Sequence, residues 1–112
     1  MSIFSRIIAR EIPADIVFES DTIIAFRDIA PQAPVHLLVV PKTEEYTNVA
    51  ELAAGDPALL AEIVETANEL ALRHSDGDYR LVFNTGANAG QTVFHVHAHV
   101  LSGALQEGTL AE

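Results

Sequence analysis

The sequence contains no cysteine, and only six of its 112 residues are basic whereas 16 are acidic. Without cysteine the chain cannot form disulfides, use a thiolate nucleophile or build a cysteine-ligated zinc site. The formal net charge of −10 repels phosphate backbones and anionic lipids. We therefore expect neither a nucleic-acid polymer nor a membrane as a partner, although local N–H groups and histidines in an acidic protein can still hold one phosphate.

The sequence also lacks any apolar run long enough to cross a bilayer. Its N-terminal segment has no signal-peptide core and no small-residue cleavage site, and Glu11 lies within it. We therefore expect this segment to belong to the fold. A cysteine-free chain of this length fits a single domain in a reducing cytoplasm, which is the location that we expect.

Residues that favour turns and helix caps divide the chain into short elements. Ser2 precedes an apolar stripe that predicts a helix over residues 3–10, and Asp56 with Pro57 predicts the start of a long helix. A continuous apolar run at residues 36–40 predicts a central strand buried on both faces. Further strands are expected over residues 16–19, 22–27, 79–84 and 92–101, a loop over residues 28–34, and another short helix over residues 47–54.

The order of these elements predicts an α+β fold. Short turns join consecutive strands and one long helix is inserted among them, which is typical of a mostly antiparallel sheet with a helix on one face. We expect five strands with one long and one short helix. The long helix should bury a single stripe, formed by Leu59, Leu60, Ile63, Val64, Ala67, Leu70 and Ala71.

Three histidines alternate with apolar residues near the end of the chain. Side chains of a strand alternate between its faces, so His95, His97 and His99 are expected on one face. The intervening Val96 and Ala98 then face the core. This arrangement brings three titratable rings within reach of one ligand.

Three interpretations fit adjacent imidazoles. The first is a set of core or solvated histidines, which explains one histidine better than three. The second is a metal site, because His-x-His on a strand is a common zinc geometry, although no cysteine and no flanking carboxylate supports it. The third is nucleophilic catalysis, in which a neutral imidazole attacks phosphorus and water then breaks the covalent intermediate.

A loop of small residues just before the histidines favours the third interpretation. Gly86 and Gly90 allow the backbone to approach a ligand closely, although glycines also suit an ordinary hairpin. We expect the N–H groups of Gly90, Gln91 and Thr92 to form an anion nest. The Thr92 hydroxyl and Asn84 are expected to face the same phosphate.

The run His-Val-His-Ala-His-Val-Leu at residues 95–101 resembles the histidine-triad motif, His-φ-His-φ-His-φ-φ with φ apolar. The chain is similar to nucleotide-binding proteins of the Hint branch of this family, the purine nucleoside phosphoramidases, at residues 3–4, 7–8, 11–14, 26, 28–29, 31–34, 36–42 and 84–103. The resemblance implies one HIT domain over residues 1–112, with residues 102–112 as a variable tail. It also implies a homodimer with the helix at residues 59–71 near its interface.

The resemblance also implies roles for individual residues. His97 becomes the nucleophile that is adenylylated, and His99 contacts the α-phosphate. His95 and His36 orient the nucleophile, and Asp28 accepts hydrogen bonds from the ribose hydroxyls. The purine slot is implied to consist of Ile3, Phe4, Ile7, Phe26 and Ile29, and the phosphate surroundings of Asn84, Gly90, Gln91 and Thr92. No cofactor and no metal enters this scheme.

The residues and the resemblance together predict a hydrolase of purine nucleoside phosphoramidates that forms a nucleotidyl-histidine and releases AMP or GMP. The alternatives are a nucleotide-binding regulator or scaffold with little catalysis, and a histidine-ligated metalloprotein. Thr92 stands where the family commonly has serine, and the tail lacks the aromatic, proline-bearing ending of animal relatives. The leaving-group preference of those relatives is therefore not carried over.

Overall fold

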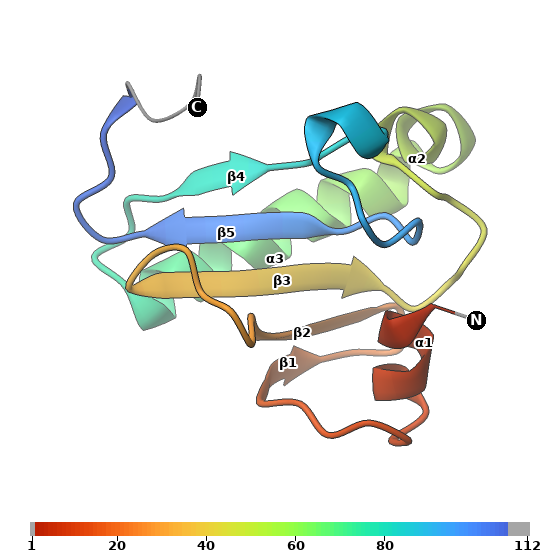
Figure 1. Cartoon of the computed structure of the whole chain (residues 1–112), viewed down its shortest axis with the longest axis horizontal. Helices are drawn as coiled ribbons and strands as arrows, with labels where there is room; N and C mark the ends of the chain where they lie inside the picture. The colour runs from red at the N-terminus through yellow and green to blue at the C-terminus, as the bar shows by residue number, and fades with distance from the viewer. Residues whose placement is uncertain (1, 108–112) are drawn as a thin grey trace.

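A five-stranded antiparallel sheet organises the computed structural model, which describes residues 2–107 (Figure 1). The strand order is β1-β2-β3-β5-β4, and every paired neighbour is antiparallel. The α+β class is confirmed, with α2 as the additional short helix. The elements are α1 (Ile3–Ile8), β1 (Ile16–Glu19), β2 (Ile23–Arg27), β3 (Val35–Pro41), α2 (Val49–Gly55), α3 (Pro57–His74), β4 (Arg80–Val82), the 3₁₀ turn η1 (Ala87–Ala89) and β5 (Ala98–Ser102).

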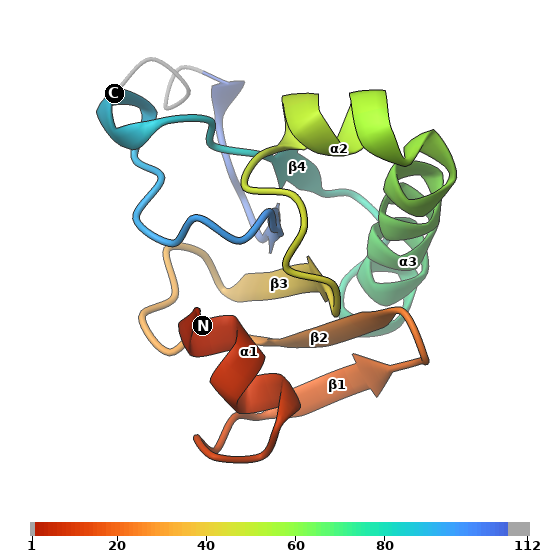
Figure 2. The ribbon, with the colours of Figure 1, turned by 90° about the vertical axis from the view of Figure 1, so that its right-hand side faces the viewer.

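Two apolar clusters cover the two faces of the sheet, with α3 on one side and α1 on the other (Figure 2). Strand β3 contributes to both clusters because its side chains alternate between the faces. Leu37 and Val39 pack with α3, whereas Leu38 and Val40 pack with α1. All four are buried, so the prediction of a central strand buried on both faces is confirmed.

The long helix α3 begins where the sequence predicts. The Asp56 carboxylate accepts a hydrogen bond from the Leu59 N–H at 3.1 Å, and Pro57 occupies the first turn. Most of the predicted stripe is buried against the sheet. Val64 lies at the edge of that stripe and is 39% exposed, so its assignment to the inner face is wrong.

The last strand is shorter than predicted, since it begins at Ala98 and not at residue 92. Pro41, at the end of β3, has no N–H for a further ladder bond, and its carbonyl accepts from the His95 ring. The Val96 N–H donates to the Tyr46 carbonyl at 3.0 Å. Residues 92–97 therefore run beside another loop before the chain enters the sheet.

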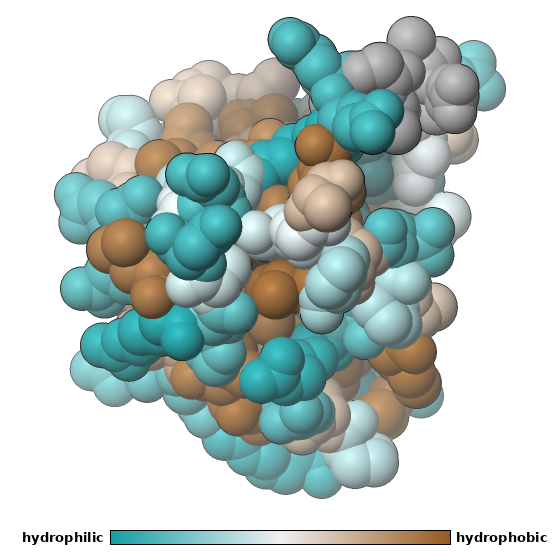
Figure 3. Space-filling view, turned by 90° about the vertical axis from the view of Figure 1, so that its left-hand side faces the viewer, coloured by the Kyte–Doolittle hydropathy of each residue, from teal (hydrophilic) through white to brown (hydrophobic). Residues whose placement is uncertain are grey.

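The surface is mixed in hydropathy. Figure 3 shows hydrophilic and hydrophobic residues interspersed over one face of the molecule. Among the helices of residues 2–107, none is both long enough and apolar enough to span a lipid bilayer.

Candidate active site

Histidines from two neighbouring strands and the preceding loop meet on the α1 face of the sheet. His36 in β3 lies opposite Leu101, and His99 in β5 lies opposite Leu38, so the two histidines are diagonal neighbours. The ring centroid of His97 lies 5.1 Å from that of His99. The structure thus brings His36, His97 and His99 together.

His95 differs from the other histidines because its ring is buried, with 1% exposed. Its Nε2 lies 2.7 Å from the Pro41 carbonyl, which can only accept, so this nitrogen carries the proton. Its Nδ1 then accepts a hydrogen bond from the Ser2 hydroxyl at 2.7 Å. Because both ring nitrogens are occupied, His95 acts on a ligand only through its neighbours.

His97 presents an unprotonated nitrogen to the site. Its Nδ1 lies 2.9 Å from the His95 carbonyl oxygen and must donate to it. This leaves a lone pair on Nε2, which takes part in no hydrogen bond within residues 2–107. Phe4 packs edge-on against the ring, with centroids 4.8 Å apart. An oriented lone pair of this kind is what a histidine nucleophile requires.

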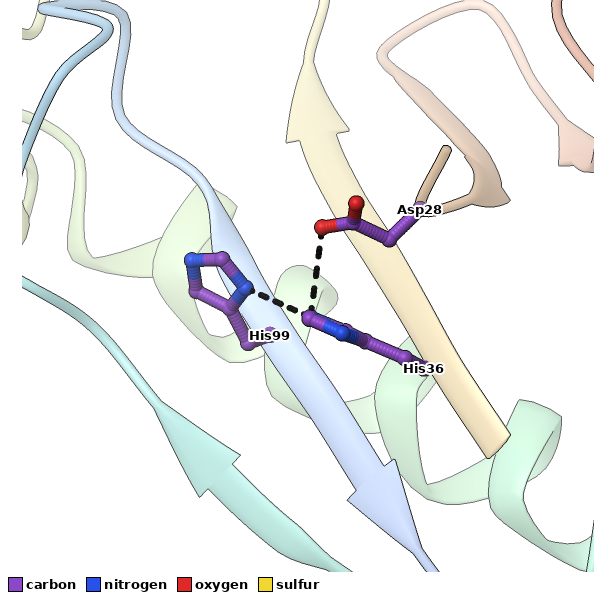
Figure 4. A group of neighbouring side chains, drawn as sticks. All are labelled: Asp28, His36 and His99. Atoms are coloured by element: carbon purple, nitrogen blue, oxygen red, sulfur yellow. Dashed lines mark hydrogen bonds and ion pairs between the residues drawn. The ribbon is translucent and has the colours of Figure 1, made fainter. Parts of the chain in front are cut away.

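A chain of hydrogen bonds fixes the protons of the other two rings (Figure 4). The backbone N–H of Gln32 donates to His36 Nδ1 at 3.0 Å, so His36 carries its proton on Nε2. That nitrogen lies 2.9 Å from His99 Nδ1 and 3.4 Å from Asp28 Oδ2. His99 Nδ1 therefore accepts, and His99 keeps an Nε2–H for a ligand. His36 thus contacts His99 and not the nucleophile that it was expected to orient.

Burial keeps these rings uncharged at neutral pH. It lowers the pKa of His97 and of His36, while Asp28 acts more weakly in the opposite direction. Burial, with the neighbouring His97 and His36, lowers the pKa of His99 to about 4. In the ligand-free site His97 is therefore a neutral nucleophile. His99 donates a hydrogen bond as a neutral imidazole, not as an imidazolium.

The same cluster has the composition of a metal site, since Asp28, His36 and His99 offer ligand atoms within 4.8 Å of one another (Figure 4). A metal ion would need a lone pair on His36 Nε2. The Gln32 N–H occupies the lone pair on Nδ1, so Nε2 carries the proton and has none to offer. The hydrogen bonds therefore favour a chain of imidazoles over a metal centre here.

An apolar pocket of about 450 Å³ lies beside the histidines. Phe4 lines this pocket and also contacts His97, so a flat group bound there lies next to the nucleophile. Asp28 lines the same pocket, with its side chain 18% exposed. The five residues predicted for the purine slot all line this pocket. Phe4, Ile7 and Phe26 are buried, whereas Ile3 and Ile29 are exposed.

The loop before the histidines differs from its prediction in one respect. The Gly90 N–H donates to the Ala87 carbonyl at 3.0 Å, and the Gln91 N–H donates to the Gly86 carbonyl at 3.1 Å. These donors are used within the loop, so the predicted anion nest over three consecutive N–H groups is wrong for two of them. The Gln91 side chain is buried and donates to the Thr47 carbonyl, so it holds the loop in place.

Other groups of the loop remain available to a ligand. Gly90 has a φ of 94°, in the left-handed region, and apart from its chain neighbours no atom of residues 2–107 lies within 4 Å of where its Cβ would be. Thr92 is exposed and lines a second pocket with Ser2 and His95, separate from the apolar one. The half-buried Asn84 forms no side-chain hydrogen bond to residues 2–107. Both polar side chains are free to bind a phosphate or a leaving group.

Two groups of the site were missed in the sequence. Ser2 was assigned only the cap of the first helix, whereas its hydroxyl also reaches His95, 93 positions away. The Gln32 N–H belongs to the backbone and carries no residue-type signal at all. Spacing between neighbouring residues could have indicated neither contact, because both depend on how distant loops fold together.

The fold and the histidine cluster define a class of small α+β proteins. In this class a histidine triad runs into the strand that pairs with the central strand, here β5 beside β3. A family described as "Scavenger mRNA decapping enzyme C-term binding" matches residues 1–111. An "Uncharacterized HIT-like protein" from Synechococcus elongatus is 51% identical over 104 residues, which cover 91% of this chain and 90% of the relative.

A purine nucleoside phosphoramidase from Escherichia coli is 42% identical over 104 residues, covering 91% of this chain and 87% of the relative. The crystal structure of a HIT family hydrolase from Legionella pneumophila superposes with a TM-score of 0.86 and 44% identity, covering 94% of this chain and 95% of that one. The chain belongs to the histidine-triad (HIT) family.

Proposed function

We propose that this chain is a nucleotide hydrolase that cleaves purine nucleoside 5′-phosphoramidates through a nucleotidyl intermediate on His97. The observation that carries the proposal is the free lone pair on His97 Nε2. The His95 carbonyl binds the proton on Nδ1 of the same ring, and the ring contacts Phe4, which lines the pocket. The relationship to a phosphoramidase and to a HIT family hydrolase supports the reaction class.

Substrate binding follows from the pocket. A purine packs between the apolar side chains, because its flat faces bury well against Phe4, Phe26 and the isoleucines. The Asp28 Oδ2 atom accepts from a ribose hydroxyl, while Oδ1 is already held by the Ala30 N–H at 2.8 Å. The α-phosphate then lies near His97, where the His99 Nε2–H can donate to its oxygens. Asn84 and Thr92 are assigned to the same phosphate or its leaving group on the family resemblance.

The reaction takes two displacements at phosphorus. His97 Nε2 forms a bond to the α-phosphorus as the P–N bond to the amine breaks, and the amine leaves with the electron pair and takes up a proton from solvent. Water then attacks the same phosphorus and the His97–phosphorus bond breaks. The hydroxyl stays on the nucleoside monophosphate, the second proton of the water replaces the one that the amine took, and His97 regains its neutral form. Hydrogen bonds to the phosphate oxygens stabilise the charge that develops in each step.

Homodimerisation is part of the same proposal. β4 is an edge strand of the sheet, and Leu72 on α3 is 63% exposed. A sheet edge that is unpaired among the described residues and an exposed apolar side chain on α3 each suit contact with a second copy. Light scattering coupled to size exclusion measures the mass, and a monomer at micromolar concentration would refute this part alone.

Turnover of adenosine and guanosine phosphoramidates by wild type and His97→Ala tests the proposal. The variant should lose at least about 10³-fold in kcat, since no other group supplies the nucleophile. It should still bind AMP in calorimetry. His74→Ala, which removes a histidine from the end of α3, is the matched control and should keep full turnover.

Rapid quenching and intact-mass analysis distinguish the enzyme from a nucleotide-binding regulator. The enzyme accumulates a nucleotidyl adduct that maps to His97, whereas a regulator binds the nucleotide without an adduct. Near-normal turnover by His97→Ala, or tight binding with no turnover by wild type, would refute the proposed function.

A further inference from the structure

The start of α1 contacts the histidine segment through the Ser2 hydroxyl, which also lies 3.2 Å from the Ser5 hydroxyl. Ser2 Oγ accepts a hydrogen bond from the Ser5 N–H at 3.0 Å, which caps the helix. The same oxygen lies 2.7 Å from His95 Nδ1. Because His95 Nε2 donates to the Pro41 carbonyl, Nδ1 can only accept, and Ser2 is the donor of this bond.

The His95 ring depends on this donor. The ring is 1% exposed, and among the described residues only Ser2 reaches Nδ1. Removing the hydroxyl leaves a buried nitrogen without a partner, which is costly unless the ring moves or exchanges its tautomer. Either response shifts the backbone around His95, where the carbonyl that holds His97 is located.

α1 reaches the nucleophile by a second route. Phe4 makes ring contacts with both His95 and His97, with centroids 5.9 Å and 4.8 Å away. Phe4 and Ile3 also line the apolar pocket. Helix α1 therefore lines the pocket and also packs against the segment that carries the nucleophile.

We propose that Ser2 is a positioning residue for His97, acting through His95, so that the first turn of α1 couples the apolar pocket to the orientation of the nucleophile. The Ser2 hydroxyl holds His95 as its Nε2–H tautomer, the His95 backbone then stays in place, and its carbonyl keeps the His97 proton on Nδ1. The catalytic consequence rests on the proposed function, whereas the tautomers do not.

Three substitutions separate positioning from helix capping. Ser2→Ala removes both the cap and the donor, and Ser2→Thr retains both. Ser2→Gly also removes the donor, but glycine is tolerated at the N-cap of a helix almost as well as serine. Ser20→Ala is the matched control, since the Ser20 hydroxyl accepts backbone N–H bonds in the β1–β2 turn, away from the site.

Kinetics give the first readout. Both Ser2→Ala and Ser2→Gly should lose about tenfold or more in kcat with little change in KM, because a small displacement of the nucleophile costs rate and not ground-state binding. Ser2→Thr should restore turnover, and Ser20→Ala should not alter it. Wild-type kcat in Ser2→Gly would assign Ser2 to capping alone and overturn the proposal. Intact mass must show the same N-terminus in every variant.

Long-range ¹H–¹⁵N correlation spectra of the histidine rings give the second readout, which needs no substrate. Wild type should show His95 with its proton on Nε2 and His97 with its proton on Nδ1. In Ser2→Ala the His97 pattern should become that of mixed tautomers, while Ser20→Ala keeps the wild-type pattern. An unchanged His97 pattern in Ser2→Ala overturns the proposal even where wild type proves unable to hydrolyse phosphoramidates.

Discussion

The two faces of the sheet use the same strands for different purposes. The α3 face is packed with aliphatic residues of β2, β3 and β5, and the partly buried Tyr46 and Tyr79 pack against them. The α1 face has a smaller buried cluster with two phenylalanines, and the histidines lie beside it. Alternation along β3 and β5 lets one sheet bury a core on one side and hold chemistry on the other.

The largest expected effect on stability comes from the α3 face. Ile63 is fully buried in the centre of α3, so Ile63→Ala should reduce the free energy of unfolding by about 2 to 5 kcal/mol. Urea denaturation measures this loss. The neighbouring Val64→Ala is the control and should cost under about 1 kcal/mol, because Val64 is already exposed. Equal losses of stability in the two variants would contradict the assignment of Ile63 to the buried side of α3 and of Val64 to its exposed side.

Acid should act on the histidine face. Folding lowers the pKa of His36, His97 and His99, with His99 at about 4 against an ordinary 6.5. Below the ordinary value the unfolded chain binds more protons than the folded one, so stability must fall as the pH drops. The difference in unfolding midpoint between pH 7 and pH 5 should be smaller in His99→Asn than in wild type. His74→Asn should behave like wild type, and identical slopes in all three proteins would refute the assignment.

A smaller effect is expected at the rim of the pocket. Ile3 lines the pocket but is 50% exposed, so Ile3→Ser should leave the unfolding midpoint nearly unchanged. Losing its apolar contact with a purine should raise KM about fivefold, corresponding to roughly 1 kcal/mol. Asp21→Ser, in the exposed turn between β1 and β2, serves as the control. A KM unchanged by Ile3→Ser would place the base elsewhere.

The smallest expected effect is that of metal removal. Because the Gln32 N–H keeps the proton of His36 on Nε2, turnover should be the same before and after dialysis against a chelator. Elemental analysis of the purified protein should find zinc well below one equivalent. Stoichiometric zinc whose loss abolishes turnover would revive the metal interpretation of Asp28, His36 and His99.

Sequence patterns predicted the elements whose signals are local. The apolar run of β3 and the Asp56–Pro57 start of α3 depend on a residue and its near neighbours, and both are confirmed. The last strand was extended too far because alternation of side chains also occurs in an extended loop. What ends the ladder is the pairing of Val96 with Tyr46, which no pattern within residues 92–101 reveals.

The candidate site was predictable in its side chains but not in its hydrogen bonds. The spacing of the triad indicated the histidines, whereas the residues that line the pocket were named from the family resemblance. The tautomers depend on Pro41, Gln32 and Ser2, which come from three different segments. The orientation of the loop donors at Gly90 and Gln91 likewise depends on how the 3₁₀ turn closes.

Main-chain atoms hold three of the imidazoles: the Pro41 carbonyl for His95, the His95 carbonyl for His97 and the Gln32 N–H for His36. An alanine scan replaces side chains and leaves such anchors intact, so position 32 would score as tolerant. Only proline, which deletes the amide hydrogen, exposes what that position contributes. Part of this site is therefore encoded in the path of the chain, and it can persist while the residues along that path change.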